Sequence, residues 1–224
     1  MRTVFIAGAH TDVGKTFVAC GLIRAARGAG LSVEALKPVA SGFDPADWAQ
    51  SDPGRLLQAL GHPLDGGELQ RMTPWRFDAP LAPPMAARLE GRGLPLAAIV
   101  DLCRARLAET RADLFVLEGV GGLMSPLADD ATGLDLMTAL ELPTVLVGGS
   151  YLGAISHTLT ALEVLRARGL TTAAVVLSQD AQPDAPDFAA TLALTAAHAG
   201  PTPVLPAPRD GSADWAADLL ALFA

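Results

Sequence analysis

The stretch FIAGAHTDVGKTF, residues 5–17, decides the fold. An apolar run ends at Gly8, a polar loop follows, and Gly-Lys-Thr at 14–16 opens a run with helical spacing of apolar residues. This order is typical of a phosphate-binding loop, whose usual spacing is G-x-x-x-x-G-K-[ST]. Here Ala9 holds the first glycine position and Gly8 lies one residue too early, so the loop is longer than the usual pattern.

The end of this loop carries the groups that bind a nucleotide. Backbone N–H groups at a helix start, together with the helix dipole, favour an anion. Gly14 lets the backbone approach a phosphate, Lys15 can reach the β- and γ-phosphates, and the Thr16 hydroxyl can ligate Mg²⁺. The alternative is a turn that only joins strand to helix, but the complete G-K-T between a strand and a helix favours phosphate binding.

Apolar runs alternate with helical patterns along the whole chain, which predicts an α/β fold. Strands are predicted at 3–7, 32–37, 113–118, 143–148, 172–177 and 202–206. Helices are predicted at 15–28, 83–91, 95–110, 132–141, 153–168, 185–198 and 212–223. The continuous apolar strands indicate a P-loop three-layer sandwich with a central, mostly parallel sheet, in a single domain over 1–224. The Pro-, Gly- and Asp-rich segment 42–82 is predicted to be functional or mobile.

Composition excludes several classes of partner. The net charge is −8, which argues against binding to a nucleic-acid backbone or an anionic membrane surface. No apolar run approaches the roughly 20 residues of a membrane span. The two cysteines, Cys20 and Cys103, lie in apolar helical patterns, as expected for buried thiols in a reducing compartment. We therefore expect a cytoplasmic protein.

Lysine is rare in this chain, and its positions are informative. Of the 16 basic residues only Lys15 and Lys37 are lysines, and the rest are arginine. Lys37 ends a predicted strand in LKPVASG, at the same sheet edge as the phosphate loop, where a compact cation can neutralise a phosphoryl group. Ser41 adds a hydroxyl just beyond it. A solvated loop lysine is the alternative.

Two acidic residues are candidates for binding a metal ion. Glu118 ends the strand in LFVLEGVGG, where a carboxylate in nucleotide-hydrolysing folds holds Mg²⁺ directly or through water. Asp52, in QSDP, is the second candidate, although Asp before Pro is most often a turn residue. The helix predicted to start near Gly153 offers another anion site. The four histidines show no metal-ligand spacing, and His157 is predicted to be an ordinary helix residue.

Several stretches together resemble the dethiobiotin synthetase family. They are GAHTDVGKT, KPVASG, SD at 51–52, APLAPPMAARLEG, LEGVGGLMSPL and VGGSYLGAISHTLTALEVLRARGL. The similarity is collinear from residue 3 to about residue 179, and the longer phosphate loop is the family's own spacing. The resemblance implies a homodimer that uses Mg²⁺ and converts 7,8-diaminopelargonate, CO₂ and ATP to dethiobiotin, ADP and phosphate.

The resemblance also implies roles for individual residues. The expected catalytic residues are Lys15, Lys37 and Thr11. Mg²⁺ would lie on Thr16, Asp52 and Glu118. The substrate would contact Thr11 and Ser41, with its tail carboxylate held by the neighbouring subunit's Gly153, Ala154, Ile155 and Ser156. The nucleotide would contact, besides the metal ligands and Lys15, Asp12, Val13, Gly14, Phe17, Gly119, Val120, Gly121, Ser178, Gln179, Pro206, Ala207 and Pro208.

The chain departs from the family pattern near the expected base-binding element. Ser178 and Gln179 stand where an asparagine is usual, and the loop LPAPRDG lacks an expected acid further on. The base preference is therefore open, and use of another nucleoside triphosphate is an alternative. From another class, a P-loop switch ATPase of the partitioning or assembly type is the alternative function. Such switches carry an extra lysine early in the loop, where this chain has Gly8 and Ala9.

Overall fold

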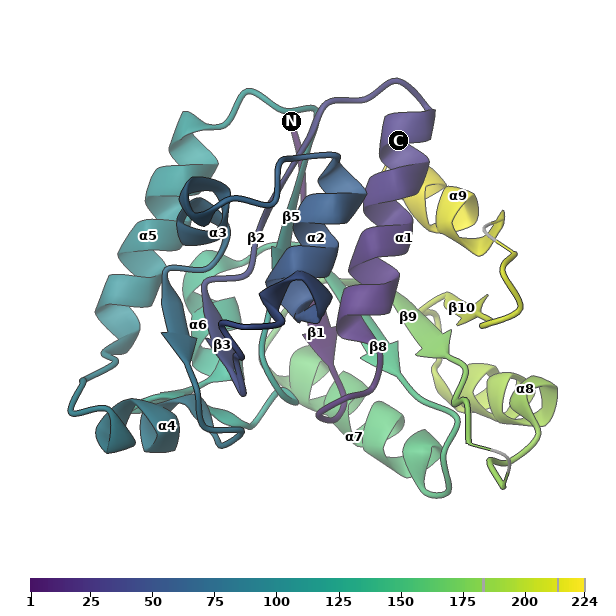
Figure 1. Cartoon of the computed structure of the whole chain (residues 1–224). Coiled ribbons are helices and arrows are strands. Elements are labelled where there is room, and N and C mark those ends of the chain that lie inside the picture. The colour runs from purple at the N-terminus through teal and green to yellow at the C-terminus, as the bar shows by residue number, and fades with distance from the viewer. Residues whose placement is uncertain (183, 213, 224) are drawn as a thin grey trace.

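The computed structural model describes residues 1–182, 184–212 and 214–223, and Figure 1 shows its arrangement. Its centre is a six-stranded sheet in the order β10-β9-β8-β1-β5-β2, and every neighbouring pair is parallel. The strands are β1 (Arg2–Gly8), β2 (Val33–Leu36), β5 (Leu114–Glu118), β8 (Thr144–Gly148), β9 (Thr172–Ser178) and β10 (Val204–Ala207). The parallel sheet predicted from the apolar runs is confirmed.

Helices cover both faces of this sheet. One face carries α1 (Lys15–Gly28), α2 (Asp52–Leu60), α3 (Gly66–Met72) and α9 (Asp214–Ala221). The other carries α4 (Pro83–Leu89), α5 (Leu96–Glu109), α6 (Gly133–Leu140), α7 (Ala154–Ala167) and α8 (Phe188–His198). Side chains of β1 alternate between the two cores, because successive strand residues point to opposite faces: Val4 and Ile6 face α1, and Phe5 and Ala7 face the second layer. The three-layer sandwich is confirmed.

The segment 42–82 contains more regular structure than its composition suggests. It holds a short 3₁₀ helix (Trp48–Gln50), α2, α3 and β4 (Trp75–Phe77), which pairs with β3 (Val39–Ser41). Helix α2 begins after Ser51, whose hydroxyl accepts a hydrogen bond from the Gly54 N–H, and it ends at Gly61 in the left-handed conformation, φ +69°. A small antiparallel pair, β6 (Pro126–Ala128) and β7 (Ala131–Thr132), follows β5.

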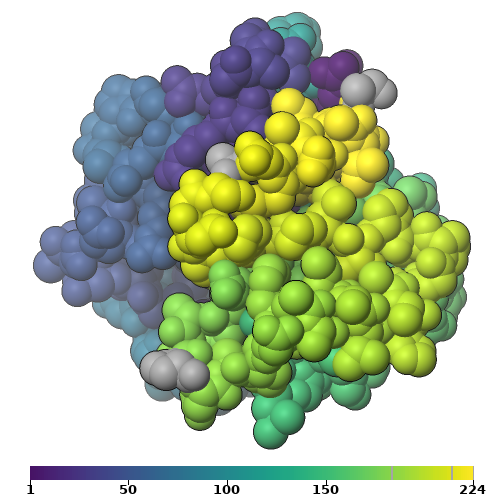
Figure 2. Space-filling view, turned by 90° about the vertical axis from the view of Figure 1, so that its right-hand side faces the viewer, coloured from purple at the N-terminus to yellow at the C-terminus, as the bar shows by residue number. Residues whose placement is uncertain are grey.

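The C-terminal part of the chain packs beside α1. Figure 2 shows α9 and the end of β10, in yellow, next to the purple N-terminal helix, and the two helices are in contact. The predicted helix 212–223 includes residue 213, which lies outside the described residues. None of the helices in the described ranges is long and apolar enough to cross a membrane. The carboxyl ends of all six strands lie at one edge, so the loops that follow them meet there.

Candidate active site

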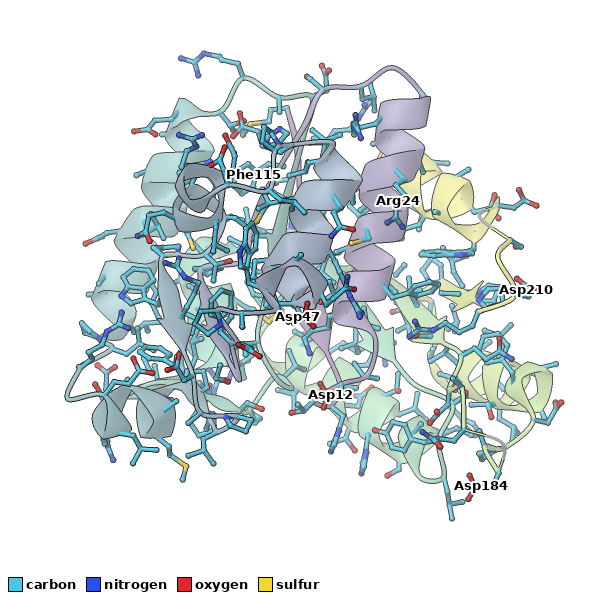
Figure 3. The ribbon with its side chains drawn as sticks, in the orientation of Figure 1. Asp12, Arg24, Asp47, Phe115, Asp184 and Asp210 are labelled. Carbon is cyan, nitrogen blue, oxygen red and sulfur yellow. The ribbon has the colours of Figure 1, made fainter. Side chains whose placement is uncertain are left out.

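The loop between β1 and α1 has the geometry of an anion cradle. Gly14 adopts φ +99°, and a Cβ at this position would lie 2.4 Å from Ser178 Oγ, so only glycine fits. Asp12, labelled at the loop in Figure 3, is also left-handed, with φ +57°. No side chain caps α1 and no acidic residue occupies its first turn. The N-terminus of α1 is therefore open to a negatively charged ligand.

A buried cluster of opposite charges lies beside this helix start. Lys37, one residue beyond β2, is 2% exposed, and Glu118 at the end of β5 is 1% exposed. The Lys37 Nζ lies 2.6 Å from Glu118 Oε1 and 3.0 Å from Asp52 Oδ2. The Thr16 hydroxyl donates to Glu118 Oε1 over 2.7 Å. Four residues predicted from separate motifs are thus brought together by α1, α2 and two neighbouring strand ends.

Burial and neighbouring charges shift the titration of these groups in opposite directions. Burial disfavours the charge on Lys37, but the carboxylates of Glu118 and Asp52 more than offset it and raise its pKa. Lys37 in turn lowers the pKa of Asp52 to about 2. Burial, followed by the positive charge of Lys37, lowers the pKa of Lys15 to about 8. The site therefore holds one firmly charged lysine and one that titrates near neutral pH.

The donor set fits Mg²⁺. Thr16, Asp52 and Glu118 offer only oxygen atoms, which is the ligand type that Mg²⁺ prefers. Glu118 Oε2 is buried and has no hydrogen-bond partner. A buried carboxylate oxygen without a partner is costly, and a cation would satisfy it. Within the described ranges no three His, Cys, Asp or Glu side chains gather as a metal cluster, so the hydroxyl is needed to complete the set.

The turn after β5 packs directly under the phosphate loop. The Gly119 N–H donates to the Ile6 carbonyl over 3.0 Å. Gly121 is left-handed, φ +64°, and a Cβ on Gly8 would lie 2.9 Å from the Gly121 carbonyl oxygen. The predicted contacts of Gly119, Val120 and Gly121 with a nucleotide remain a prediction, but these residues do lie against the loop.

The ends of β9 and β10 form the other wall of the site. Ser178 lies against Gly14, and the Gln179 N–H donates to the Ala207 carbonyl over 3.1 Å. Beyond Pro206, Ala207 and Pro208, Arg209 donates from Nη2 to Ser178 Oγ over 3.0 Å. Arg209 is not among the residues predicted from the sequence, because the family pattern has an acid rather than an arginine in this loop. The signal available was a lone arginine directly after the predicted base-binding residues.

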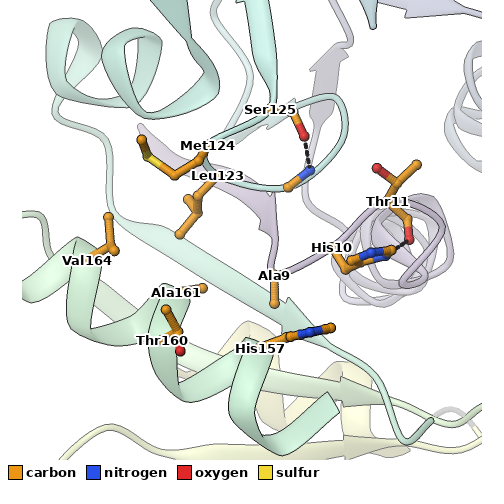
Figure 4. Close-up of a pocket in the computed structure, with 11 residues that line it drawn as sticks. Ala9, His10, Thr11, Leu123, Met124, Ser125, His157, Thr160, Ala161 and Val164 are labelled. Carbon is orange, nitrogen blue, oxygen red and sulfur yellow. Dashed lines mark hydrogen bonds between the residues drawn. The ribbon is translucent and has the colours of Figure 1, made fainter. Parts of the chain in front are cut away.

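A cavity of about 390 Å³ lies between the phosphate loop and α7, and Figure 4 shows it. Thr11 and His10 line one side, and His157 of α7 lines the other. The His10 and His157 rings stack at 5.5 Å, and the Tyr151 hydroxyl hydrogen-bonds to His157 Nδ1 over 2.8 Å. His157 lies in α7, as the sequence predicts, and it also contacts side chains of two loops.

The remaining predicted substrate residues lie apart from the charged cluster. Helix α7 follows Gly153, which is left-handed with φ +94°, and no side chain caps this helix start. Gly153, Ile155 and Ser156 line a cavity against α8, whereas Thr11 lines the cavity described above. Ser41 ends β3 and pairs with Phe77. In the described part of the chain, the start of α7 and Thr11 thus line two different cavities.

The chain is similar throughout its length to known proteins. A family model described as an AAA domain matches residues 2–207. The ATP-dependent dethiobiotin synthetase of Phenylobacterium zucineum is 63% identical over 98% of this chain and 94% of its own length. The corresponding enzyme of Caulobacter vibrioides is 53% identical over 96% of this chain and 95% of its own.

Solved structures share the fold at low identity. A MinC:MinD cell division complex from Aquifex aeolicus contains a chain with a TM-score of 0.53 at 10% identity, covering 98% of this chain and 86% of that one. The septum site-determining protein MinD of Pyrococcus horikoshii, solved with Mg-ADP, gives 0.52 at 14% identity, with the same coverage. These likenesses show the fold only.

Proposed function

Because the chain belongs to the AAA-domain family and, within it, to the dethiobiotin synthetases, we propose that it makes dethiobiotin from 7,8-diaminopelargonate, CO₂ and ATP. The single observation that supports this best is the buried Lys37–Glu118 pair, 2.6 Å apart, beside the open N-terminus of α1. A fully buried lysine is rare unless it is paired, and here its position matches the KPVASG element of the family resemblance. The chain would act as one P-loop domain.

The reaction joins two anions, which explains the need for both lysines. One amine of the substrate adds to CO₂ and loses a proton to give a carbamate. A carbamate oxygen attacks the γ-phosphorus, ADP leaves, and the second amine then attacks the carbonyl carbon, expels phosphate and closes the ring. Lys15 and Lys37 neutralise the carbamate and the γ-phosphate as they meet, and Thr11 and Ser41 orient the diamine.

Thr16, Asp52 and Glu118 would hold Mg²⁺, as the unpartnered Glu118 Oε2 supports. A bound Mg²⁺ would neutralise charge on the β- and γ-phosphates. Gly14 and the first N–H groups of α1 bind and orient the phosphates, while the left-handed Asp12 shapes the turn before them. Withdrawal of Lys37 from the two carboxylates toward the substrate would then leave them free for the metal.

We further propose that the chain works as a homodimer in the cytoplasm. The start of α7, at Gly153–Ser156, has an uncapped helix N-terminus that suits a carboxylate. Gly153, Ile155 and Ser156 line a different cavity from the one that Thr11 lines. A second subunit would supply this helix start to the site. The neighbouring Leu152 is 90% exposed, and a second subunit at this position would cover its apolar side chain.

The test is phosphate release from Mg-ATP with bicarbonate, with and without 7,8-diaminopelargonate, while dethiobiotin is followed by mass spectrometry. We expect phosphate only when the diamine is present, in a one-to-one ratio with dethiobiotin. Phosphate release that ignores the diamine would instead favour the partitioning-type switch ATPase, since that class shares this fold. A Lys37→Ala control should release no phosphate above background.

A further inference from the structure

The Arg209 guanidinium lies over an aromatic ring. Its central carbon lies 3.9 Å from the centroid of the Phe17 ring. Three hydrogen bonds fix it: Nη2 to Ser178 Oγ at 3.0 Å, Nε to the Gln179 carbonyl at 3.3 Å, and its backbone N–H to Gln179 Oε1 at 2.9 Å. An arginine fixed in this way presents a rigid planar face, which lysine cannot do.

This arginine lies within reach of a nucleotide bound at the phosphate loop. Its Nη2 would be 3.1 Å from a Cβ built on Gly14, the residue that precedes α1. It also lines a cavity of about 480 Å³ together with Phe17, Arg24 and Trp215. Figure 3 shows Arg24 on α1 and Asp210, the residue after Arg209, in the loop that leads to α9. The volume suits a nucleoside.

Several hydrogen-bond groups that could read the edge of a base are already used within the protein. The Gln179 N–H donates to the Ala207 carbonyl, and the Gln179 side-chain oxygen accepts from Arg209. Pro206 and Pro208 have no N–H to donate. Stacking on the guanidinium competes with none of these bonds, and stacking is nearly independent of base identity because every base has a π-face.

We propose that the face of the Arg209 guanidinium that points away from Phe17 is the platform on which the nucleobase stacks, and that this chain consequently binds nucleotides with little discrimination between bases. The inference rests on the proposed function only in placing the phosphates at the loop. It makes Arg209 the residue that sets the affinity for the base, whichever base is bound. A site built on hydrogen bonds to the base would discriminate by several orders of magnitude, whereas a stacking platform discriminates little.

The experiment measures equilibrium binding of the Mg²⁺ complexes of ADP, GDP, CDP and UDP by calorimetry, without diamine. We expect the four dissociation constants of the wild-type chain to agree within about tenfold. Arg209→Ala and Arg209→Lys should each weaken all four by about tenfold or more, as base–aromatic and base–guanidinium stacking contribute. Binding of Mg-tripolyphosphate, which has no base, should be unchanged in both variants.

Arg104→Ala is the matched control, because it removes a positive charge from α5, on the opposite face of the sheet from this cavity. It should leave all four affinities unchanged. Preference of the wild-type chain for one base by more than about a hundredfold would overturn the proposal. So would wild-type affinity of Arg209→Lys, or equal losses for tripolyphosphate, since each would make Arg209 a simple charge. These affinities do not depend on whether the chain makes dethiobiotin, so the two proposals fail separately.

Discussion

Replacing Lys37 with methionine would remove the charge that compensates Glu118. The two side chains are 2% and 1% exposed, so no water can take over the role of the ammonium group. Breaking a buried ion pair by removing one partner costs about 3–5 kcal/mol. For a domain of this length each kcal/mol lowers Tm by about 2–4 °C, so we expect a fall of roughly 6–20 °C. Asp52 is half-exposed and should lose little by itself.

The assay is thermal unfolding of the ligand-free protein followed by circular dichroism. The matched control is Arg71→Met, which breaks the exposed Arg71–Glu68 pair and should leave Tm unchanged. Lys37→Met combined with Glu118→Gln removes both buried charges, and it should recover most of the lost stability. The reasoning is refuted if Lys37→Met melts like the Arg71 control, or if the double variant is no more stable than the single one.

Three further outcomes are expected. Lys37→Arg should bind ATP but lose nearly all turnover in the coupled phosphate assay, because a planar guanidinium cannot replace a compact ammonium; near wild-type turnover would contradict this. Gly14→Ala should abolish nucleotide binding in calorimetry, since its Cβ would lie 2.4 Å from Ser178 Oγ, and Ser178→Gly should restore part of it. The folded-state pKa of Lys15, about 8, lies below its ordinary value of 10.5, so the unfolded chain binds more protons between these values and stability rises with pH there. The Tm of the wild type minus the Tm of Lys15→Met should therefore increase from about pH 7.5 to about pH 9.5. A Tm difference that stays constant over this range would contradict the burial of a charged Lys15.

The central sheet could be read from the sequence because its strands are buried on both faces. Runs such as 113–118 and 143–148 are apolar without alternation, and the structure places strands at Leu114–Glu118 and Thr144–Gly148. The convergence of Lys37 and Glu118 also followed from position alone, because the carboxyl ends of neighbouring parallel strands share one edge.

Helix α2 was not predicted, because it lies in a segment rich in Pro, Gly and Asp. Its signals are local and standard: Ser51 as N-cap, Pro53 in the first turn and Gly61 just past the end. The density of Pro, Gly and Asp around it obscured them. Asp52, which the sequence offers as a second metal ligand or as a turn residue, is the first residue of this helix, and its carboxylate lies 3.0 Å from Lys37 Nζ.

Contacts between loops that are distant along the chain could not be predicted from the sequence. The stack of His10 on His157 joins the phosphate loop to α7, and the stack of Arg209 on Phe17 joins the loop after β10 to α1. Neither pair has a characteristic spacing along the chain, because each depends on how two loops fold over the strand ends. Such contact residues can be identified only from a structure that shows which loops line each cavity.

Because both lysines lie in one site, amine-reactive reagents would modify this chain at few positions. An acylating reagent has only the N-terminal amine, Lys15 and Lys37 to modify. Lys15 has the lowered pKa and thus the larger share of nucleophilic free amine near neutral pH, whereas Lys37 stays protonated. A nucleotide carrying an acyl phosphate would therefore tag the phosphate loop at a single side chain, and the yield of that tag would report directly how fully the loop is occupied.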